Sequence, residues 1–112
     1  MIKLKRVYAP VDRGEGRRFL IDRVWPRGIR KDAAGVEAWV KDAAPSDALR
    51  KWFGHDPSRW PEFQRRYRAE LEARPEVLAE LLDAARQGDI TLVYSARDEE
   101  HNQAVLEERL RA

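Results

Sequence analysis

Apolar and basic residues alternate over residues 2–8, where Ile2 and Leu4 are separated by lysine. This period of two predicts a half-exposed β-strand. A short apolar run at residues 19–21, together with Val24 and stopped by Pro26 and Gly28, predicts a buried second strand. A parallel crossover needs roughly a dozen residues, so these strands are not expected to be adjacent parallel neighbours. A hairpin, which would make the sheet mixed, is one alternative.

The next segment fits two interpretations. Residues 36–40 could form a third strand, whereas residues 31–43 could also be helical. Ser46 then has the position of an N-cap for a short helix that ends at Gly54. Its inward-facing residues would be Leu49, Trp52 and Phe53.

The second half of the chain carries helical periods around one clear strand. An N-cap and proline at Asp56-Pro57 begin a helix, and Pro75 begins another that Gly88 stops. Residues 90–94 are the clearest strand, and Asp98 is expected to cap a last helix. The residues predicted to face the core from these helices are Trp60, Phe63, Tyr67, Leu71, Val77, Leu78, Leu81, Leu82, Ala85, Val105, Leu106 and Leu110.

Strands interleaved with helices predict an α/β fold. We expect a small three-layer domain, with a central mixed (mostly parallel) sheet of about four strands and helices packed on it. The 112 residues suit a single domain over 1–112. Four Trp, three Tyr and three Phe supply bulky core residues, which argues against disorder.

Composition excludes several classes of function. The net charge of +2, from 22 basic and 20 acidic residues, makes general nucleic-acid binding a poor expectation. Without cysteine there is no disulfide, thiol nucleophile or cysteine-based zinc site. No apolar run approaches the ~20 residues of a membrane helix, and the charged start lacks a signal-peptide core. We therefore expect a cytoplasmic protein with no membrane partner, and the sequence does not indicate an oligomeric state.

Four blocks of sequence occur in an order that resembles the YeaO-like family, a branch of the domain of unknown function 488 group. They are DRVWPRG at 22–28, WVKDAAPS at 39–46, LRKWFGHD at 49–56 and YSARDEEHN at 94–102. The resemblance covers nearly the whole chain and implies a bacterial α/β domain without implying a substrate. Other branches of the group carry cysteines in the segment corresponding to 94–102. This chain has none, so thiol chemistry does not transfer to it.

Polar residues follow three of the predicted strands. Ligands of open α/β sheets usually lie beyond the carboxyl ends of the strands, so these residues converge if the strands are mutually parallel. They are Arg23 and Arg27 after the second strand, Lys41 after the third, and Ser95, Arg97 and Asp98 after the last.

Arg23 and Arg27 flank Trp25 and a proline that restricts the backbone. One hypothesis is an anion clamp for phosphate or carboxylate, with Trp25 as a flat wall for a ring. The alternative is that Asp22 or Asp42 pairs with an arginine while Trp25 belongs to the core. Lys41 could add charge to the clamp or simply be solvated.

The residues leaving the last strand would complete the site. Tyr94, Ser95, Asp98 and Asn102 would bind hydroxyl or amide groups or move protons, and Arg97 could join either set. Asp98 or His101 would act in general acid–base catalysis. No cofactor is implied, and the two histidines lack the spacing of metal ligands.

Three functions compete on this basis. The first is a small-molecule hydrolase or transferase acting on an anionic substrate, for which no nucleophile can be named. The second is a non-catalytic module that binds a nucleotide or metabolite. The third and weakest is a nucleic-acid-binding transcriptional regulator, because the helix from Pro75 offers only Arg86 as a basic residue.

Overall fold

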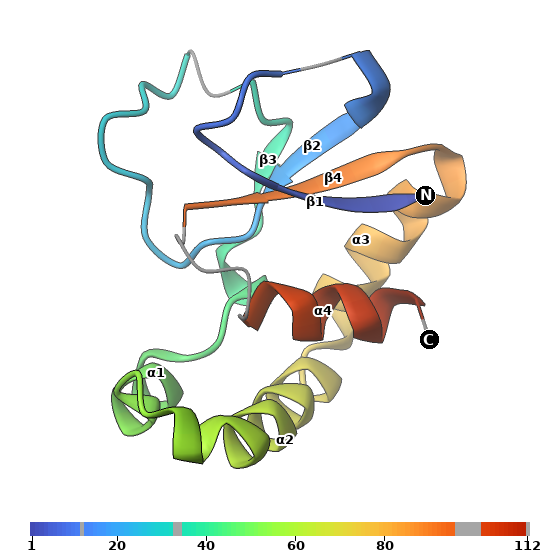
Figure 1. The fold of residues 1–112 in the computed structure, drawn as a ribbon. Helices are drawn as coiled ribbons and strands as arrows, with labels where there is room; N and C mark the ends of the chain where they lie inside the picture. The colour runs from blue at the N-terminus through green and yellow to red at the C-terminus, as the bar shows by residue number, and fades with distance from the viewer. Residues whose placement is uncertain (12, 33–34, 96–101, 112) are drawn as a thin grey trace.

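The computed structural model of the protein describes residues 1–11, 13–32, 35–95 and 102–111, with only the backbone at 102 and 103. Strands and helices alternate along the chain (Figure 1). The strands are β1 (Ile2–Arg6), β2 (Arg17–Leu20), β3 (Ala38–Trp39) and β4 (Ile90–Tyr94). The α-helices are α1 (Asp47–Phe53), α2 (Trp60–Glu72), α3 (Pro75–Gln87) and α4 (Asn102–Arg111). Short 3-10 helices are η1 (Arg13–Glu15), η2 (Lys41–Ala43) and η3 (Pro57–Arg59). This element order confirms the predicted α/β class.

The sheet has the order β1-β4-β2-β3, and every described pair of strands is parallel. The predicted separation of the first two strands is confirmed, because β4 lies between β1 and β2. The hairpin alternative, and with it the mixed sheet, is wrong. Residues 7–16 carry the chain back to the start of β2. Ten residues can span roughly 33–36 Å, which suffices for a return across one intervening strand.

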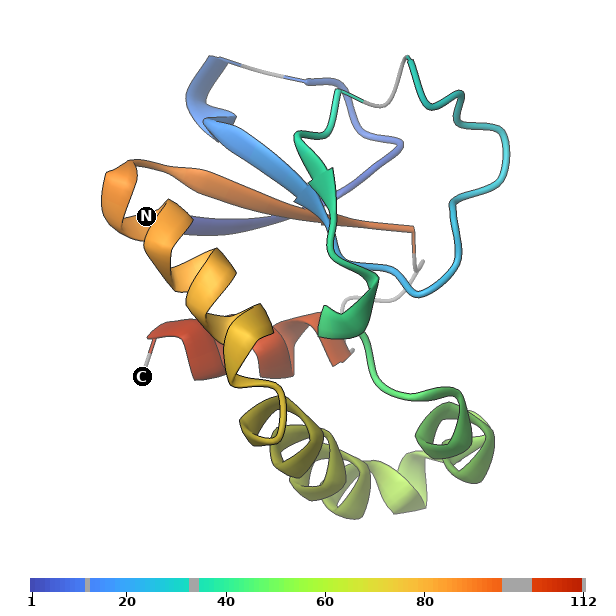
Figure 2. The ribbon, with the colours of Figure 1, turned by 180° about the vertical axis from the view of Figure 1, so that it is seen from behind.

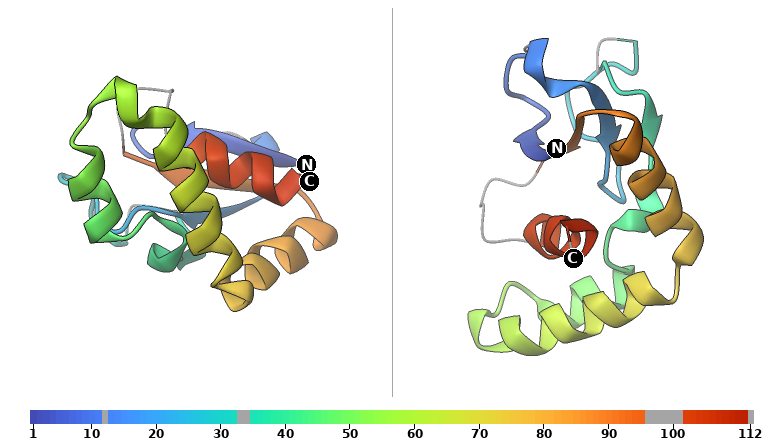
Figure 3. Two further views of the ribbon diagram at one scale, coloured as in Figure 1. Left: turned by 90° about the horizontal axis from the view of Figure 1, so that it is seen from below. Right: turned by 90° about the vertical axis from the view of Figure 1, so that its right-hand side faces the viewer.

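The two faces of the sheet are covered differently. All four α-helices lie on one side, with α4 between the sheet and α2 (Figures 1 and 3). From behind, α3 runs from the end of α2 toward the sheet (Figure 2). Phe19 and Ile21 belong to the large core under these helices, whereas Leu20 and Val93 face a smaller cluster on the other side. That second face is covered by the loops that leave β1 and β2, so the third layer is loop rather than helix.

A buried ionic group lies beneath the loop layer. Glu15 is 3% exposed and its Oε2 is 2.5 Å from the Lys5 Nζ. Arg18 is also buried, with its Nε 3.5 Å from the Glu15 Oε1. The Thr91 hydroxyl donates to the Glu15 carbonyl oxygen at 2.7 Å. These contacts attach η1 to β1, β2 and β4 and so fix the loop on this face.

The predicted helix ends among the described residues are confirmed, except that Asp56 caps the 3-10 helix η3 and α2 begins at Trp60. The Ser46 hydroxyl accepts the Leu49 N–H at 3.1 Å, and Gly54 ends α1 in the left-handed region at φ 54°. The Asp56 carboxylate accepts the Ser58 N–H at 3.0 Å. Pro75 begins α3, and Val105, Leu106 and Leu110 of α4 are buried. The predicted cap at Asp98 lies outside the described residues.

The ambiguous segment follows the strand alternative, and its described residues are helical only at 41–43. Ala38–Trp39 pairs with β2, which confirms a short third strand, and η2 follows at once. At the opposite edge of the sheet, Gly16 has φ +67°, and a Cβ there would lie 2.1 Å from the Asp89 carbonyl oxygen. Only glycine fits this approach, which allows the Arg17 N–H to reach the same oxygen at 3.1 Å.

No helix in the described ranges is long and apolar enough to cross a membrane.

Candidate functional site

All four carboxyl ends meet at one edge of the sheet because the strands are parallel. The condition for convergence of the post-strand residues is therefore fulfilled. The loop that follows β2 passes around this edge (Figure 1). In sheets of this kind, ligands bind beyond the carboxyl ends.

An open hollow of about 650 Å³ lies at this edge. It is lined by Arg6, Tyr8, Val24, Trp25, Pro26, Arg27 and Ser95. Three of the predicted site residues, Trp25, Arg27 and Ser95, share it. The charged side chains among these lining residues are both guanidinium groups, and none is a carboxylate, so the described lining is cationic.

Hydrogen bonds from side chains to carbonyl oxygens fix the residues that line the hollow. The Tyr8 hydroxyl donates to the Arg27 carbonyl oxygen at 2.9 Å, which ties the end of β1 to the loop after β2. The Arg6 Nη2 donates to the Ser95 carbonyl oxygen at 3.2 Å, and the Arg6 guanidinium lies 5.3 Å from the Tyr8 ring centroid. Arg6 is thereby held beside the hollow rather than extended into solvent.

Two tryptophans fix the loop that carries Arg27. The Trp25 Nε1 donates to the Ile29 carbonyl oxygen at 2.7 Å, and the Trp39 Nε1 donates to the Asp22 carbonyl oxygen at 2.6 Å. Their rings meet edge to face, with centroids 5.4 Å apart and an interplanar angle of 73°. Trp25 packs in the smaller cluster, as the core alternative expects, and it also borders the hollow, while its role as a wall for a ligand ring stays a prediction.

Arg23 lies apart from the hollow and binds the protein's own chain. Its Nε donates to the Pro45 carbonyl oxygen at 3.1 Å and its Nη2 to the Ala44 carbonyl oxygen at 3.3 Å. Its Nη1 is 3.7 Å from the Asp42 Oδ1, as the alternative of an internal pair expects. The structure thus separates Arg23 from Arg27, although only three residues stand between them.

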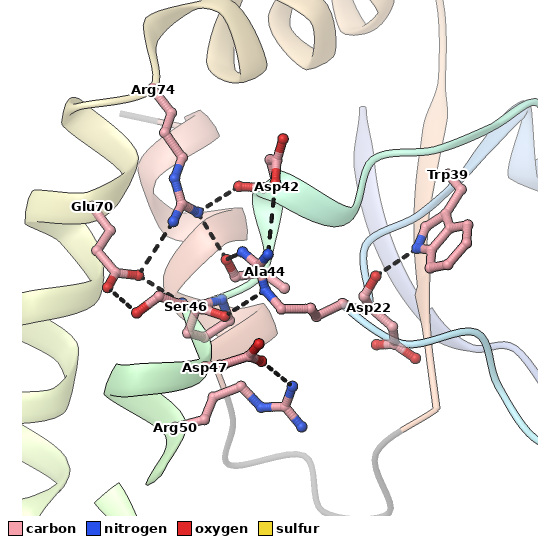
Figure 4. Close-up of polar contacts among 11 residues, drawn as sticks. Asp22, Trp39, Asp42, Ala44, Ser46, Asp47, Arg50, Glu70 and Arg74 are labelled. Atoms are coloured by element: carbon pink, nitrogen blue, oxygen red, sulfur yellow. Dashed lines mark hydrogen bonds and ion pairs between the residues drawn. The ribbon is translucent and has the colours of Figure 1, made fainter. Parts of the chain in front are cut away.

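Arg74 approaches the same segment from the other side (Figure 4). Its Nη1 donates to the carbonyl oxygens of Asp42 at 2.6 Å and Ala44 at 2.9 Å. Glu70 binds Arg74 at 3.8 Å and accepts the Ser46 N–H at 2.8 Å and the Ser46 hydroxyl at 2.5 Å (Figure 4). We call Arg23, Arg74 and Glu70 the carbonyl clamp. Within the carbonyl clamp, Ser46 is held as the structural cap of α1, which agrees with the role predicted for Ser46.

Asp22 follows β2 and lies between the hollow and the carbonyl clamp. Its Oδ2 accepts the Ser95 N–H at 2.9 Å. Burial raises the pKa of the Asp22 carboxyl above its ordinary value, while the hydrogen bonds from Ser95 and the charge of Arg50 act in the opposite direction. A half-buried carboxyl with a raised pKa at the carboxyl edge of a sheet is a candidate functional residue.

The remaining predicted residues do not line the hollow or are not described. Lys41 is exposed, with its Nζ 5.2 Å from the Trp39 ring centroid. Tyr94 is buried in the large core on the helix side. Arg97, Asp98 and His101 lie outside the described residues, and only the backbone of Asn102 is described, at the start of α4. Their proposed roles stay predictions.

Arg6 and Tyr8 were missed by sequence reasoning for a physical reason. The rule that ligands lie beyond carboxyl strand ends applies to the first strand only if that strand is parallel to the others. The hairpin alternative placed its end at the far edge. The basic and aromatic residues at the end of β1 were the available signal.

A metal site has no support in the part of the chain that is described, which contains no group of three or more His, Asp or Glu able to hold an ion.

The family model DUF488-N3i, described as the inactive DUF488-N3 subclade, matches residues 1–112. The chain belongs to this family. It is 39% identical to the uncharacterized protein YeaO of Escherichia coli over 105 residues, covering 94% of this chain and 91% of YeaO. It is 44% identical over 96 residues to the uncharacterized protein Rv3073c of Mycobacterium tuberculosis, covering 86% and 80% of the two chains. The predicted YeaO-like resemblance is confirmed. No solved structure matches the chain at a significant level.

Proposed function

We propose that this protein is a non-catalytic binding module that holds a small organic anion in the hollow at the carboxyl edge of its sheet. The anion would bind between Arg6 and Arg27. A flat or apolar portion of the ligand would lie against Trp25, Val24 and Pro26. A nucleotide or a phosphorylated or carboxylated metabolite has this combination of groups.

The observation that carries the proposal is the environment of Arg27. Most arginines of the described chain have a carboxylate close by, as in Arg17 with Glu37 and Arg109 with Glu72. Arg27 is exposed, lines the hollow and has no ion pair with any described residue. Its backbone is fixed through the hydrogen bond from Tyr8. A guanidinium that is anchored at its base and unpaired at its tip suits bidentate recognition of phosphate or carboxylate.

Two considerations favour binding over catalysis. The family is described as inactive. The described lining of the hollow offers guanidinium groups, phenol and serine hydroxyls and apolar surface, but no carboxylate or imidazole that could act as a general base. A hydrolase or transferase would need such a group in reach of its substrate.

The test is calorimetric titration of phenyl phosphate, which combines a phosphate with a flat ring. Arg27→Ala should weaken binding roughly 10-fold or more, because a hydrogen bond to a charged group contributes about 1.5–3 kcal/mol. Arg13→Ala is the matched control, since Arg13 is also exposed without a described ion pair and does not line the hollow. It should leave the dissociation constant nearly unchanged.

Two results would count against this function. Equal binding by Arg27→Ala and the native protein would remove the hollow as the site. Release of phenol at a rate that Arg27→Ala abolishes would make the protein an enzyme rather than a binding module.

A further inference from the structure

We propose that Asp22 is a positioning residue of this anion site. Asp22 holds the backbone of Ser95 so that the Ser95 carbonyl oxygen orients Arg6 beside the hollow. The inference rests on the proposed function, since it names a residue that acts on the same site without lining it. Asp22 does not line the hollow. It would act on the ligand only through Ser95 and Arg6.

The two ends of the Ser95 residue carry the argument. Its N–H donates to the Asp22 Oδ2 at 2.9 Å, and its carbonyl oxygen accepts from the Arg6 Nη2 at 3.2 Å. Ser95 follows β4, which lies between β1 and β2 in the sheet. Asp22 on one side and Arg6 on the other therefore hold the same residue from the two neighbouring strands.

Asp22 is itself fixed from the remaining strand. Its carbonyl oxygen accepts the Trp39 Nε1 of β3 at 2.6 Å, and Figure 4 shows the Trp39 ring directed at the Asp22 backbone. One line of hydrogen bonds thus runs from Trp39 through Asp22 and Ser95 to Arg6. It crosses the carboxyl ends of all four described strands and ends at the hollow.

Charge and geometry predict opposite effects of changing Asp22, which makes the role testable. A negative charge close to the hollow disfavours an anion, so loss of that charge by itself should tighten binding. Loss of the acceptor for Ser95 should loosen Arg6 and weaken binding. Asp22→Asn removes the charge and keeps an acceptor oxygen, whereas Asp22→Ala removes both.

The experiment is titration of phenyl phosphate into the native protein, Asp22→Asn and Asp22→Ala. The Asn variant should bind at least as tightly as the native protein. The Ala variant should bind roughly two- to tenfold more weakly, the range of a typical hydrogen bond. Asp42→Ala is the matched control, because Asp42 also follows a strand at this edge but contacts Arg23 instead of Ser95. It should leave the dissociation constant unchanged.

A second arm tests whether Asp22 acts through Arg6. In an Arg6→Ala background, Asp22→Ala should no longer weaken binding further. Equal affinities of the Ala and Asn variants, or an undiminished effect of Asp22→Ala without Arg6, would overturn the inference. If Asp22→Ala does not fold, Asp22→Ser makes the same comparison, because serine is too short to replace the carboxylate at Ser95.

The outcomes also separate this inference from the proposed function. Weak binding by Arg27→Ala together with native-like binding by Asp22→Ala would leave the anion site standing and reject the role of Asp22. Absence of phenyl phosphate binding by the native protein would reject both.

Discussion

Arg23 and Arg27 flank the same tryptophan and proline, yet they belong to different regions of the molecule. Arg23 belongs to the carbonyl clamp, where it binds the carbonyl oxygens of Ala44 and Pro45 and lies near the Asp42 carboxylate. Arg27 borders the hollow and pairs with no described carboxylate. Two guanidinium groups from one turn thus have different chemical environments, one filled by the protein's own acceptors and one without a described carboxylate.

The difference between Arg23 and Arg27 comes from backbone carbonyl groups that have no hydrogen-bond partner in regular structure. The short η2 helix and the extended residues after it leave the oxygens of Asp42, Ala43, Ala44 and Pro45 without partners in regular structure, so side chains have to satisfy them. Arg23 and Arg74 supply the donors at three of these positions, and the Tyr67 hydroxyl donates to Ala43. Burial raises the pKa of Tyr67, which keeps this hydroxyl protonated as a donor. Arg23 is thus occupied by the protein's own acceptors, whereas Arg27 donates to no acceptor among the described residues.

The largest expected effect is the loss of stability on removing Arg23. Its side chain is only 21% exposed, and Arg23→Ala leaves the Pro45 carbonyl oxygen without its charged donor and the Ala44 carbonyl oxygen with Arg74 alone. We expect a loss of about 2–3 kcal/mol in the free energy of unfolding. Arg27→Ala should change it by less than about 0.5 kcal/mol, as is usual for an exposed side chain. Urea unfolding of both variants measures the contrast, and equal losses would break the distinction between clamp and hollow.

A smaller loss is expected when the acid of the clamp is removed. Glu70 accepts two hydrogen bonds from Ser46 and faces Arg74, so Glu70→Ala should cost about 1–2 kcal/mol of stability. Glu108→Ala is the control, because Glu108 makes an exposed ion pair with Arg68 at 3.3 Å. Such pairs contribute about 0–1 kcal/mol. Chemical denaturation that ranks Glu108 above Glu70 would contradict the structural role of the clamp.

The smallest effect concerns Asp22, which lies between the two regions. Its folded pKa is raised above the ordinary 3.8, so the unfolded chain releases the proton first as pH rises. Native stability should therefore fall as pH rises from 3.8 through the raised folded value, and remain lowered at neutral pH. Asp22→Asn lacks this dependence and keeps an acceptor for Ser95. The Tm of the variant minus that of the native protein should increase between pH 3 and pH 7. A decrease would mean that the carboxylate stabilises the fold.

Local signals predicted much of the fold correctly. Ser46, Gly54 and Pro75 mark helix ends because capping depends on residues that are neighbours in sequence. The five residues of β4 form the most apolar strand, and all of them are buried at the centre of the sheet. The direction of β1 was not predictable in this way, since it depends on β4 inserting between β1 and β2 from more than 80 residues along the chain.

The candidate site could be predicted only in part. The rule of carboxyl strand ends identified Arg27, Trp25 and Ser95, all of which border the hollow. The hydrogen bonds of Arg23 could not be predicted, because their acceptors are carbonyl oxygens that lie some 20 residues later in the sequence. The sequence indicates Asp22 only as a partner for arginine, because its contact with Ser95 joins residues 73 positions apart.

A crystal structure of the protein with phenyl phosphate tests the central claim most directly. The phosphate should lie between the guanidinium groups of Arg6 and Arg27, with the phenyl ring against Trp25, while Arg23 keeps its bonds to Ala44 and Pro45. A phosphate bound at the carbonyl clamp or on another surface, with the hollow left to solvent, would contradict the account.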